Sequence, residues 1–224
     1  MHNPTRADHP IAFVLTHWIN LLAMFFLALS GFYIHFPFVS GAMGVARGTH
    51  FFWMFVLLIN LVVRIVLAFV VKDNVTMDGK EATDWHNFWF QKENRHQLWP
   101  TIKYYLFLKK ESPISAKYGV LQKVAYVATI PLTLLAAWSG FAIWGPTMDW
   151  PFFEASRDMV SSWFGTAGAG DPMNMRILHY YIMWVILIFT AIHAYLANVY
   201  NFAPSKLIFA WKETPGAHAA DKVA

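Results

Sequence analysis

Four long apolar stretches divide the chain, and each is long enough to cross a lipid bilayer as a helix. A spanning helix needs about 20 mostly apolar residues, and every one of the four stretches meets that length. Segments rich in Gly, Pro and Asp separate them and predict turns. The predicted spans cover approximately residues 11–34, 48–71, 119–144 and 175–199. We therefore predict an all-α membrane protein that folds as a four-transmembrane-helix bundle.

The composition agrees with this pattern and limits the kinds of cofactor and metal site that the chain can form. Of the 224 residues, 57% are hydrophobic and only 13% are charged, and the mean hydropathy is +0.39. A soluble domain carries about twice that share of charge, so a water-soluble core is excluded. The 18% aromatic residues, with 11 Trp, suit the interfacial belts of a membrane protein. The absence of cysteine excludes iron–sulfur clusters, thiolate zinc sites, disulfides and c-type haem.

The distribution of basic residues predicts how the spans are oriented. Of the 17 Lys and Arg residues, 13 lie in the two tails, in the connection between spans two and three, or at the start of span three. On the other side are Arg47, Arg157 and Arg176, and Arg64 falls inside span two. Since cytoplasmic segments are enriched in Lys and Arg, both termini are expected to be cytoplasmic. The bases form no single patch, so no nucleic-acid partner is expected.

The connections between the spans carry three further expectations. The segment Leu98–Glu111 mixes apolar and basic residues and predicts a short interfacial cytoplasmic helix between spans two and three. Residues 145–174 are expected to form an outer loop whose aromatic side chains serve as an interfacial anchor or as a docking surface. In span three, Pro131 predicts a kink and not an end. Residues 1–210 are assigned to the membrane domain and residues 211–224 to a polar C-terminal tail, and no cleavable signal is expected.

Histidines inside the predicted spans are the strongest functional feature of the sequence. Ionisable residues within a membrane are costly and are functional by default. His17 lies in span one, His50 in span two, and His179 and His193 in span four. The 14 residues between the last two are close to four helical turns, which places both imidazoles near one face and about 21 Å apart along the axis.

The depth of each histidine predicts two pairs. His17 and His193 each lie six residues from a cytoplasmic end of their spans, whereas His50 and His179 lie close to the outer ends. This arrangement predicts two sites with two imidazole ligands each, stacked across the membrane. Neutral imidazole is a standard axial ligand of haem iron. We therefore predict two haem b groups that are held without covalent links.

Other residues lie at the two predicted haem levels. Gly31 follows the histidine of span one by 14 residues, and Gly140 lies at a similar depth, so both permit close approach of a macrocycle near the outer site. Arg64 follows the histidine of span two by 14 residues and either binds a propionate of the inner haem or extends to the cytoplasmic headgroups. His35 either meets a propionate of the outer haem or anchors the end of span one at the interface.

Several motifs together resemble a known family. They are T-H-W-I-N from Thr16, S-G-F-Y-I-H-F-P from Ser30, R-G-T-H-F from Arg47, N-L-V-V-R-I from Asn60 and H-x13-H from His179. In these motifs the chain resembles the b-type cytochrome subunit of membrane-bound nickel–iron hydrogenases. It is also similar to the gamma subunit of respiratory formate dehydrogenase and to cytochrome b561-like anchors. The resemblance extends from about Pro10 to Phe209.

The resemblance implies a role in electron transfer within the prokaryotic cytoplasmic (inner) membrane. Catalytic and iron–sulfur subunits of a hydrogenase-like complex would dock on the outer face, and menaquinone or ubiquinone would accept the electrons. In this family pattern His50 and His179 hold the outer haem, and His17 and His193 hold the inner one. The chain would then be an electron-transfer subunit that is not catalytic alone, except for the quinone step.

The resemblance also locates the quinone beside the inner haem, near the start of span three. That region reads K-Y-G-V-L-Q-K from Lys117, and Gly119 stands where the family pattern has Asn. Polar residues near this level are the candidates to line the quinone region, together with the inner histidines. They are Asn20, Asn60, Arg64, Gln122 and Tyr126.

Two other functions are compatible with the residues. The same haems would serve a standalone b561-type quinone oxidase, or the anchor of another anaerobic oxidoreductase such as thiosulfate reductase. A different class is a proton or metal transporter that uses the span histidines as a relay. However, the sequence shows no inverted repeats, and no Asp or Glu lies in the predicted spans. The visible spectrum of the reduced protein distinguishes a cytochrome from a transporter.

Overall fold

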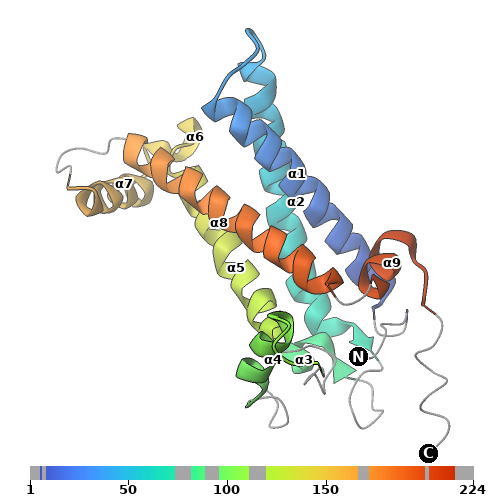
Figure 1. Ribbon diagram of the computed structural model, residues 1–224. Helices are drawn as coiled ribbons and strands as arrows, with labels where there is room; N and C mark the ends of the chain where they lie inside the picture. Colours follow the sequence, from blue (N-terminus) through green and yellow to red (C-terminus); the bar gives the residue numbers. More distant parts are fainter. Residues whose placement is uncertain are drawn as a thin grey trace, which may run out of the picture. The chain divides into compact units, whose positions relative to one another are not determined.

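The computed structural model describes residues 6, 9–73, 82–88, 96–110, 120–165, 172–199 and 202–214 (Figure 1). Within this part of the chain, four helices are long and apolar enough to cross a membrane, as predicted. Their limits differ from the predicted ones by at most a few residues. They are α1 (Ile11–His35), α2 (Met43–Val70), α5 (Val120–Phe141) and α8 (Pro172–Asn198). The α5 helix continues through Pro131 and does not end there, also as predicted.

Short elements fill the connections. A two-residue antiparallel pair joins β1 (Lys72–Asp73) to β2 (Ala82–Thr83) and is a small exception to the all-α prediction. The remaining elements are α3 (Asp84–Phe88), α4 (Leu98–Tyr105), α6 (Gly145–Met148), α7 (Pro151–Trp163) and α9 (Ala203–Ala210). The α4 helix begins at the predicted Leu98 but ends at Tyr105. Its location at a membrane interface stays a prediction.

The expectation of a loop over residues 145–174 was wrong for much of that segment, because α6 and α7 occupy it. Pro151 is the first residue of α7, where its missing N–H costs nothing and its fixed φ favours a helix start. Glu154 lies in the first turn, where a negative charge interacts favourably with the helix dipole. The aromatic run at the start of this segment is therefore the beginning of a helix.

The chain divides into two compact units. The first contains residues 1–127 and 193–224, and the second contains residues 128–192. In the first unit α1 and α2 lie side by side and antiparallel (Figure 1). Asn60 of α2 donates to the Thr16 carbonyl at 2.8 Å, and the rings of Phe26 and Trp53 stack at 4.8 Å. These contacts join the middle parts of the two helices.

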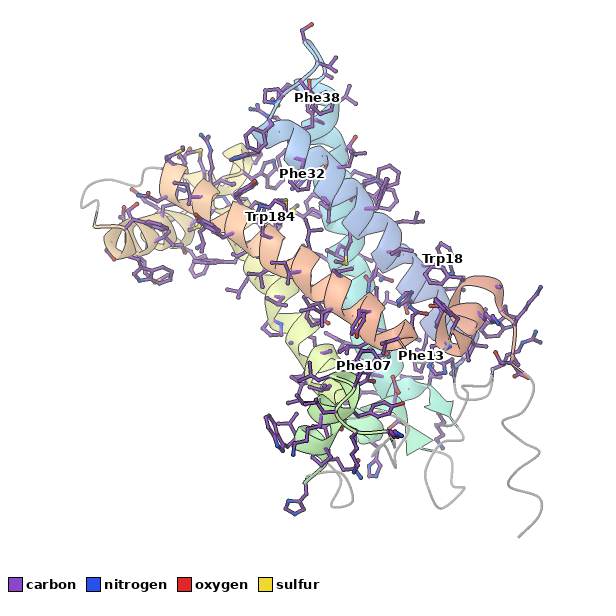
Figure 2. All side chains as sticks on the ribbon, in the orientation of Figure 1. Phe13, Trp18, Phe32, Phe38, Phe107 and Trp184 are labelled. Carbon is purple, nitrogen blue, oxygen red and sulfur yellow. The ribbon has the colours of Figure 1, made fainter. Side chains whose placement is uncertain are left out.

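The α9 helix packs against the start of α1 in the same unit. Trp18 donates its ring N–H to the carbonyl of Ile208 at 3.0 Å, and the Phe209 ring lies edge-on to Trp18 at 5.1 Å. Figure 2 labels Trp18 on the side of α1 next to α9. The last described helix of the chain is thereby attached to the end of α1 that carries His17.

The second unit contains a small core where α7 meets the ends of two spans. Ala142, Val160 and Met175 are fully buried there, and Trp138 and Phe153 pack against them. These residues come from the end of α5, from α7 and from the start of α8. The α7 helix is therefore a packed part of this unit.

Candidate functional site

The structure places all four span histidines on membrane-length helices. His17 lies on α1, His50 lies on α2, and His179 and His193 lie on α8. The α8 helix is continuous from Pro172 to Asn198. Its two histidines therefore keep the predicted separation of about 21 Å and point to nearly the same side of the helix.

A serine of α1 holds the His50 ring. The Oγ atom of Ser30 lies 3.0 Å from Nδ1 of His50. The same hydroxyl donates to the carbonyl oxygen of Phe26, one turn earlier on α1, at 2.5 Å. Since a serine hydroxyl has one proton, this bond leaves its oxygen to accept a proton from Nδ1 of the imidazole.

The second unit repeats this arrangement at His179. The Oγ atom of Ser139 on α5 lies 2.8 Å from Nδ1 of His179, and the hydroxyl donates to the Leu135 carbonyl at 2.8 Å. Next to this serine, a Cβ atom added to Gly140 would lie 3.3 Å from Cε1 of His179. Gly140 therefore makes room for the imidazole ring itself.

Both serine contacts favour the same imidazole tautomer. With the proton on Nδ1, the lone pair is on Nε2, which is the nitrogen that then coordinates a metal. A hydrogen bond from the second ring nitrogen is the usual means by which proteins orient a ligating histidine. The geometry within each unit is therefore compatible with the predicted role of His50 and His179 as metal ligands, which stays a prediction.

His17 and His193 belong to the first unit and interact electrostatically. The Nδ1 atom of His17 is buried and has no hydrogen-bond partner among the described residues. Buried polar atoms are nearly always satisfied in proteins, so this nitrogen is a candidate to bind a ligand. The Phe209 ring of α9 lies edge-on to His17 at 6.4 Å, and the His193 side chain is exposed.

Next to this end of α1 is an ion pair. Nη2 of Arg64 donates to Oδ2 of Asp84 at 2.6 Å, and Asp84 has no exposed surface. The Arg64 guanidinium also lies 4.1 Å over the ring of Phe13, and Tyr126 interacts electrostatically with both charged groups. Asp84 therefore balances the positive charge that span two carries into the membrane. A bond from Arg64 to a haem propionate stays a prediction.

The structure brings together only some of the predicted quinone residues. Asn60 is buried and donates to Oδ1 of Asn20 at 2.6 Å. Tyr126 lies with Arg64 and Asp84, as described above. Gln122 is on α5, but its side chain lies outside the described part of the structure.

Two residues predicted near the outer haem, Gly31 and His35, both lie on α1. Gly31 is half-buried on α1. His35 is the exposed last residue of that helix and contacts the ring of Phe36 at 4.4 Å. Their predicted roles, contact with a macrocycle and with a propionate, stay predictions.

Sequence reasoning missed the two serines and Asp84. Ser30 and Ser139 precede Gly31 and Gly140, the two glycines predicted near the outer haem, so a Ser-Gly pair repeats in spans one and three. Asp84 had no such pattern, because it lies in a connection that is far from Arg64 in sequence. Only the fold of that connection brings its carboxylate to α2.

The residues present fit haem b. Haem iron in such sites takes neutral imidazole nitrogens as axial ligands, and the four span histidines supply them. Two are oriented by a serine, and a third has a buried nitrogen for which the described residues offer no bond. The chain contains no cysteine that would attach the group covalently.

Comparisons with known proteins agree with this chemistry. A "Probable Ni/Fe-hydrogenase 1 B-type cytochrome subunit" of Escherichia coli (strain K12) is 27% identical over 189 residues, which are 81% of this chain and 77% of that protein. A "Probable Ni/Fe-hydrogenase B-type cytochrome subunit" of Rhizobium leguminosarum bv. viciae is 30% identical over 197 residues, or 81% and 75%. The similarly named protein of Azotobacter vinelandii is 23% identical over 192 residues. The prokaryotic cytochrome b561 family matches residues 8–210, and the chain belongs to this family.

Proposed function

We propose that this chain is the membrane anchor of a hydrogenase-like complex and carries electrons to quinone by means of two haem b groups, which supply reversible one-electron transfer when bound. His50 and His179 would hold the outer group, and His17 and His193 the inner one. The observation that carries the proposal is the serine contact at Nδ1 of both His50 and His179. Packing alone does not require the same tautomer at two histidines on different helices.

The membrane itself supports a relay with two stations. Imidazoles about 21 Å apart on one helix lie near opposite sides of a hydrocarbon core about 30 Å thick. A single haem near one surface would be too far from the other surface to exchange electrons with both a partner on one side and a quinone on the opposite side. The protein holds and orients the ligands, and burial and nearby charges adjust the redox potential.

The proposed sidedness follows from charge. The excess of Lys and Arg in the tails and in the connection between α2 and α5 supports a cytoplasmic location for these parts. The catalytic partner would then dock on the outer face, near His50 and His179. The names of the relatives support a nickel–iron hydrogenase as that partner.

The quinone would be reduced near His17, on the cytoplasmic side. The hydrogen-bonded pair Asn20 and Asn60 and the group formed by Arg64, Asp84 and Tyr126 provide polar side chains within the first unit. Hydroxyl and amide groups of this kind bind quinone carbonyl oxygens. Protons taken up from the cytoplasm would complete the formation of quinol.

A purification from native membranes in mild detergent tests the proposal. We expect two haem b per chain in a pyridine haemochrome assay, together with copurified subunits that carry iron–sulfur clusters. We also expect electrons from those subunits to reduce a water-soluble quinone analogue. A preparation without haem would favour transport, and a single haem would contradict the two-site assignment. A chain that exchanges electrons with quinone while no partner is bound would instead support the standalone cytochrome.

A further inference from the structure

The α7 helix joins two membrane spans and has no role in the proposed electron transfer. It lies between the end of α5 and the start of α8, beside the first turns of α8 (Figure 1). All three helices meet in the second unit, so their contacts can be compared directly.

One side of α7 packs against the rest of the second unit. The buried guanidinium of Arg157 donates to the carbonyl oxygens of Ala142 at 2.9 Å and Met148 at 2.5 Å. These carbonyls lie at the C-terminal ends of α5 and α6, where helices leave acceptors unpaired. Val160 is fully buried in the core described above. The orientation of α7 about its own axis is therefore determined by packing.

The same contacts determine the depth of α7. Trp138 donates its ring N–H to Oγ of Ser156 at 3.1 Å, and Asn174 donates its amide N–H to Oγ of Ser161 at 3.3 Å. Trp138 lies three residues inside the end of α5, or about 4.5 Å along the axis. Asn174 lies in the first turn of α8. The α7 helix is therefore level with the last turn of the spans and does not stand above them.

The remaining surface of α7 is divided into two sectors. At about 100° per residue, Phe152, Met159 and Trp163 fall within a stripe about 40° wide, which we call the apolar stripe. Their side chains are 65%, 44% and 62% exposed. The exposed acids Glu154 and Asp158 lie together in a separate sector, about 140° around the helix axis from the centre of the apolar stripe. The α7 helix therefore has a face that packs against the rest of the second unit, an exposed apolar stripe and an exposed acidic sector.

We propose that the apolar stripe of α7 inserts into the lipid at the boundary between headgroups and acyl chains. Helices that lie in this boundary bury an apolar face about 5–10 Å deep while a polar face stays in water. The depth of α7 and its separate acidic sector match this arrangement. The exposed Trp150 and Phe164 flank the helix and suit the same interfacial zone. A soluble partner would have to reach below the ends of the spans to cover this stripe.

Cysteine labelling tests the proposal, because the natural chain has no cysteine. Single variants carry Cys at the stripe positions (Phe152→Cys, Met159→Cys and Trp163→Cys) or at the acidic positions (Glu154→Cys and Asp158→Cys). Each full-length chain is labelled with a nitroxide and placed in phosphatidylcholine nanodiscs. Collision with oxygen, which concentrates in lipid, is compared with collision with a water-soluble nickel chelate. Neighbouring positions 158 and 159 form a matched pair, since neither side chain belongs to the packed face.

We expect at least a fivefold higher oxygen-to-nickel accessibility ratio at the stripe positions than at the acidic ones. Equal ratios in the two sectors, or greater nickel access at the stripe, would overturn the proposal. The measurement is repeated after the catalytic partner is bound. Protection of the stripe only in that complex would identify it as a protein docking surface and would also overturn the proposal. The result does not depend on haem content, so its failure is distinguishable from failure of the proposed electron transfer.

Discussion

The histidines at the two ends of the α1–α2 pair have different surroundings. At one end, Ser30 holds the His50 ring through Nδ1. At the other end, the Nδ1 atom of His17 is buried without a hydrogen-bond partner in the described structure, and an aromatic ring of α9 packs against the imidazole. An ion pair lies near the second end, between Arg64 and Asp84. A hydroxyl orients the first imidazole, whereas packing and nearby charges surround the second.

The difference bears on how each proposed haem site is controlled. A ligand that is oriented by a hydrogen bond is prepared before the cofactor arrives, which strengthens binding. A site beside a partly buried ion pair is sensitive to a change in local charge, because electrostatic interactions are stronger where the dielectric constant is low. We therefore expect the His50 and His179 site to respond to loss of hydroxyl groups, and the His17 and His193 site to respond to loss of charge.

Removal of a ligand should have the largest effect. His50→Ala and His17→Ala are each expected to lower the haem content from two per chain to about one, because iron loses one of its two axial ligands at a single site. A pyridine haemochrome assay with redox titration identifies which haem remains. His96→Ala, at an exposed position in the connection between α2 and α5, serves as the control and should retain both haems. Two haems in either ligand variant would refute the assignment of that residue.

Loss of the serine hydroxyls should have the next largest effect. Ser30→Ala and Ser139→Ala are each expected to weaken haem binding by about 10- to 100-fold at the His50 and His179 site only, as is typical when the group that orients a ligand is removed. Haem retention during dilution and the low-spin EPR signal measure this change. Thr190→Ala is the matched control, since its hydroxyl donates only to the Ile186 carbonyl of its own helix. An equal loss in the control would mean that the serines act on stability alone.

Loss of the Asp84 charge should act at the other site. In Asp84→Asn the positive charge of Arg64 is no longer balanced, so the ferric state near His17 is disfavoured. We expect the midpoint potential of that haem to rise by on the order of 50 mV, the effect of about 1 kcal/mol. Spectroelectrochemical titration resolves the two haems, and Asp149→Asn at an exposed position is the control. A shift confined to the other haem would contradict the proposed depth of the ion pair.

The smallest change concerns the space around His179. A Cβ atom at position 140 would lie 3.3 Å from Cε1 of that ring, so Gly140→Ala requires a shift of a few tenths of an ångström. We expect both haems to remain bound, with a small change in the EPR g values of one of them. Gly145→Ala is the control, because no atom lies within 4 Å of its added Cβ. An unchanged spectrum in Gly140→Ala would show that the ring does not depend on this space.

The four spans and the four histidines could be predicted from the sequence because both depend on local rules. A membrane requires about 20 apolar residues for each crossing, and a fixed helical rise converts the interval between His179 and His193 into a distance. The α7 helix was missed because three of the four buried residues on its packed face, Ser156, Arg157 and Ser161, are polar. In the sequence, such polar residues are typical of a loop. Their role in packing becomes clear only from their partners near the end of α5 and at the start of α8.

The sequence by itself predicts the number of membrane-length helices, which the structure confirms for the residues that it describes, and it also predicts their orientation and the depth of each candidate ligand. Only the tertiary structure decided which group orients each imidazole and which carboxylate balances Arg64. Those contacts join residues 20 or 40 positions apart on different elements. Hydropathy and helical periodicity describe one element at a time, whereas a hydrogen bond between two elements depends on how they pack.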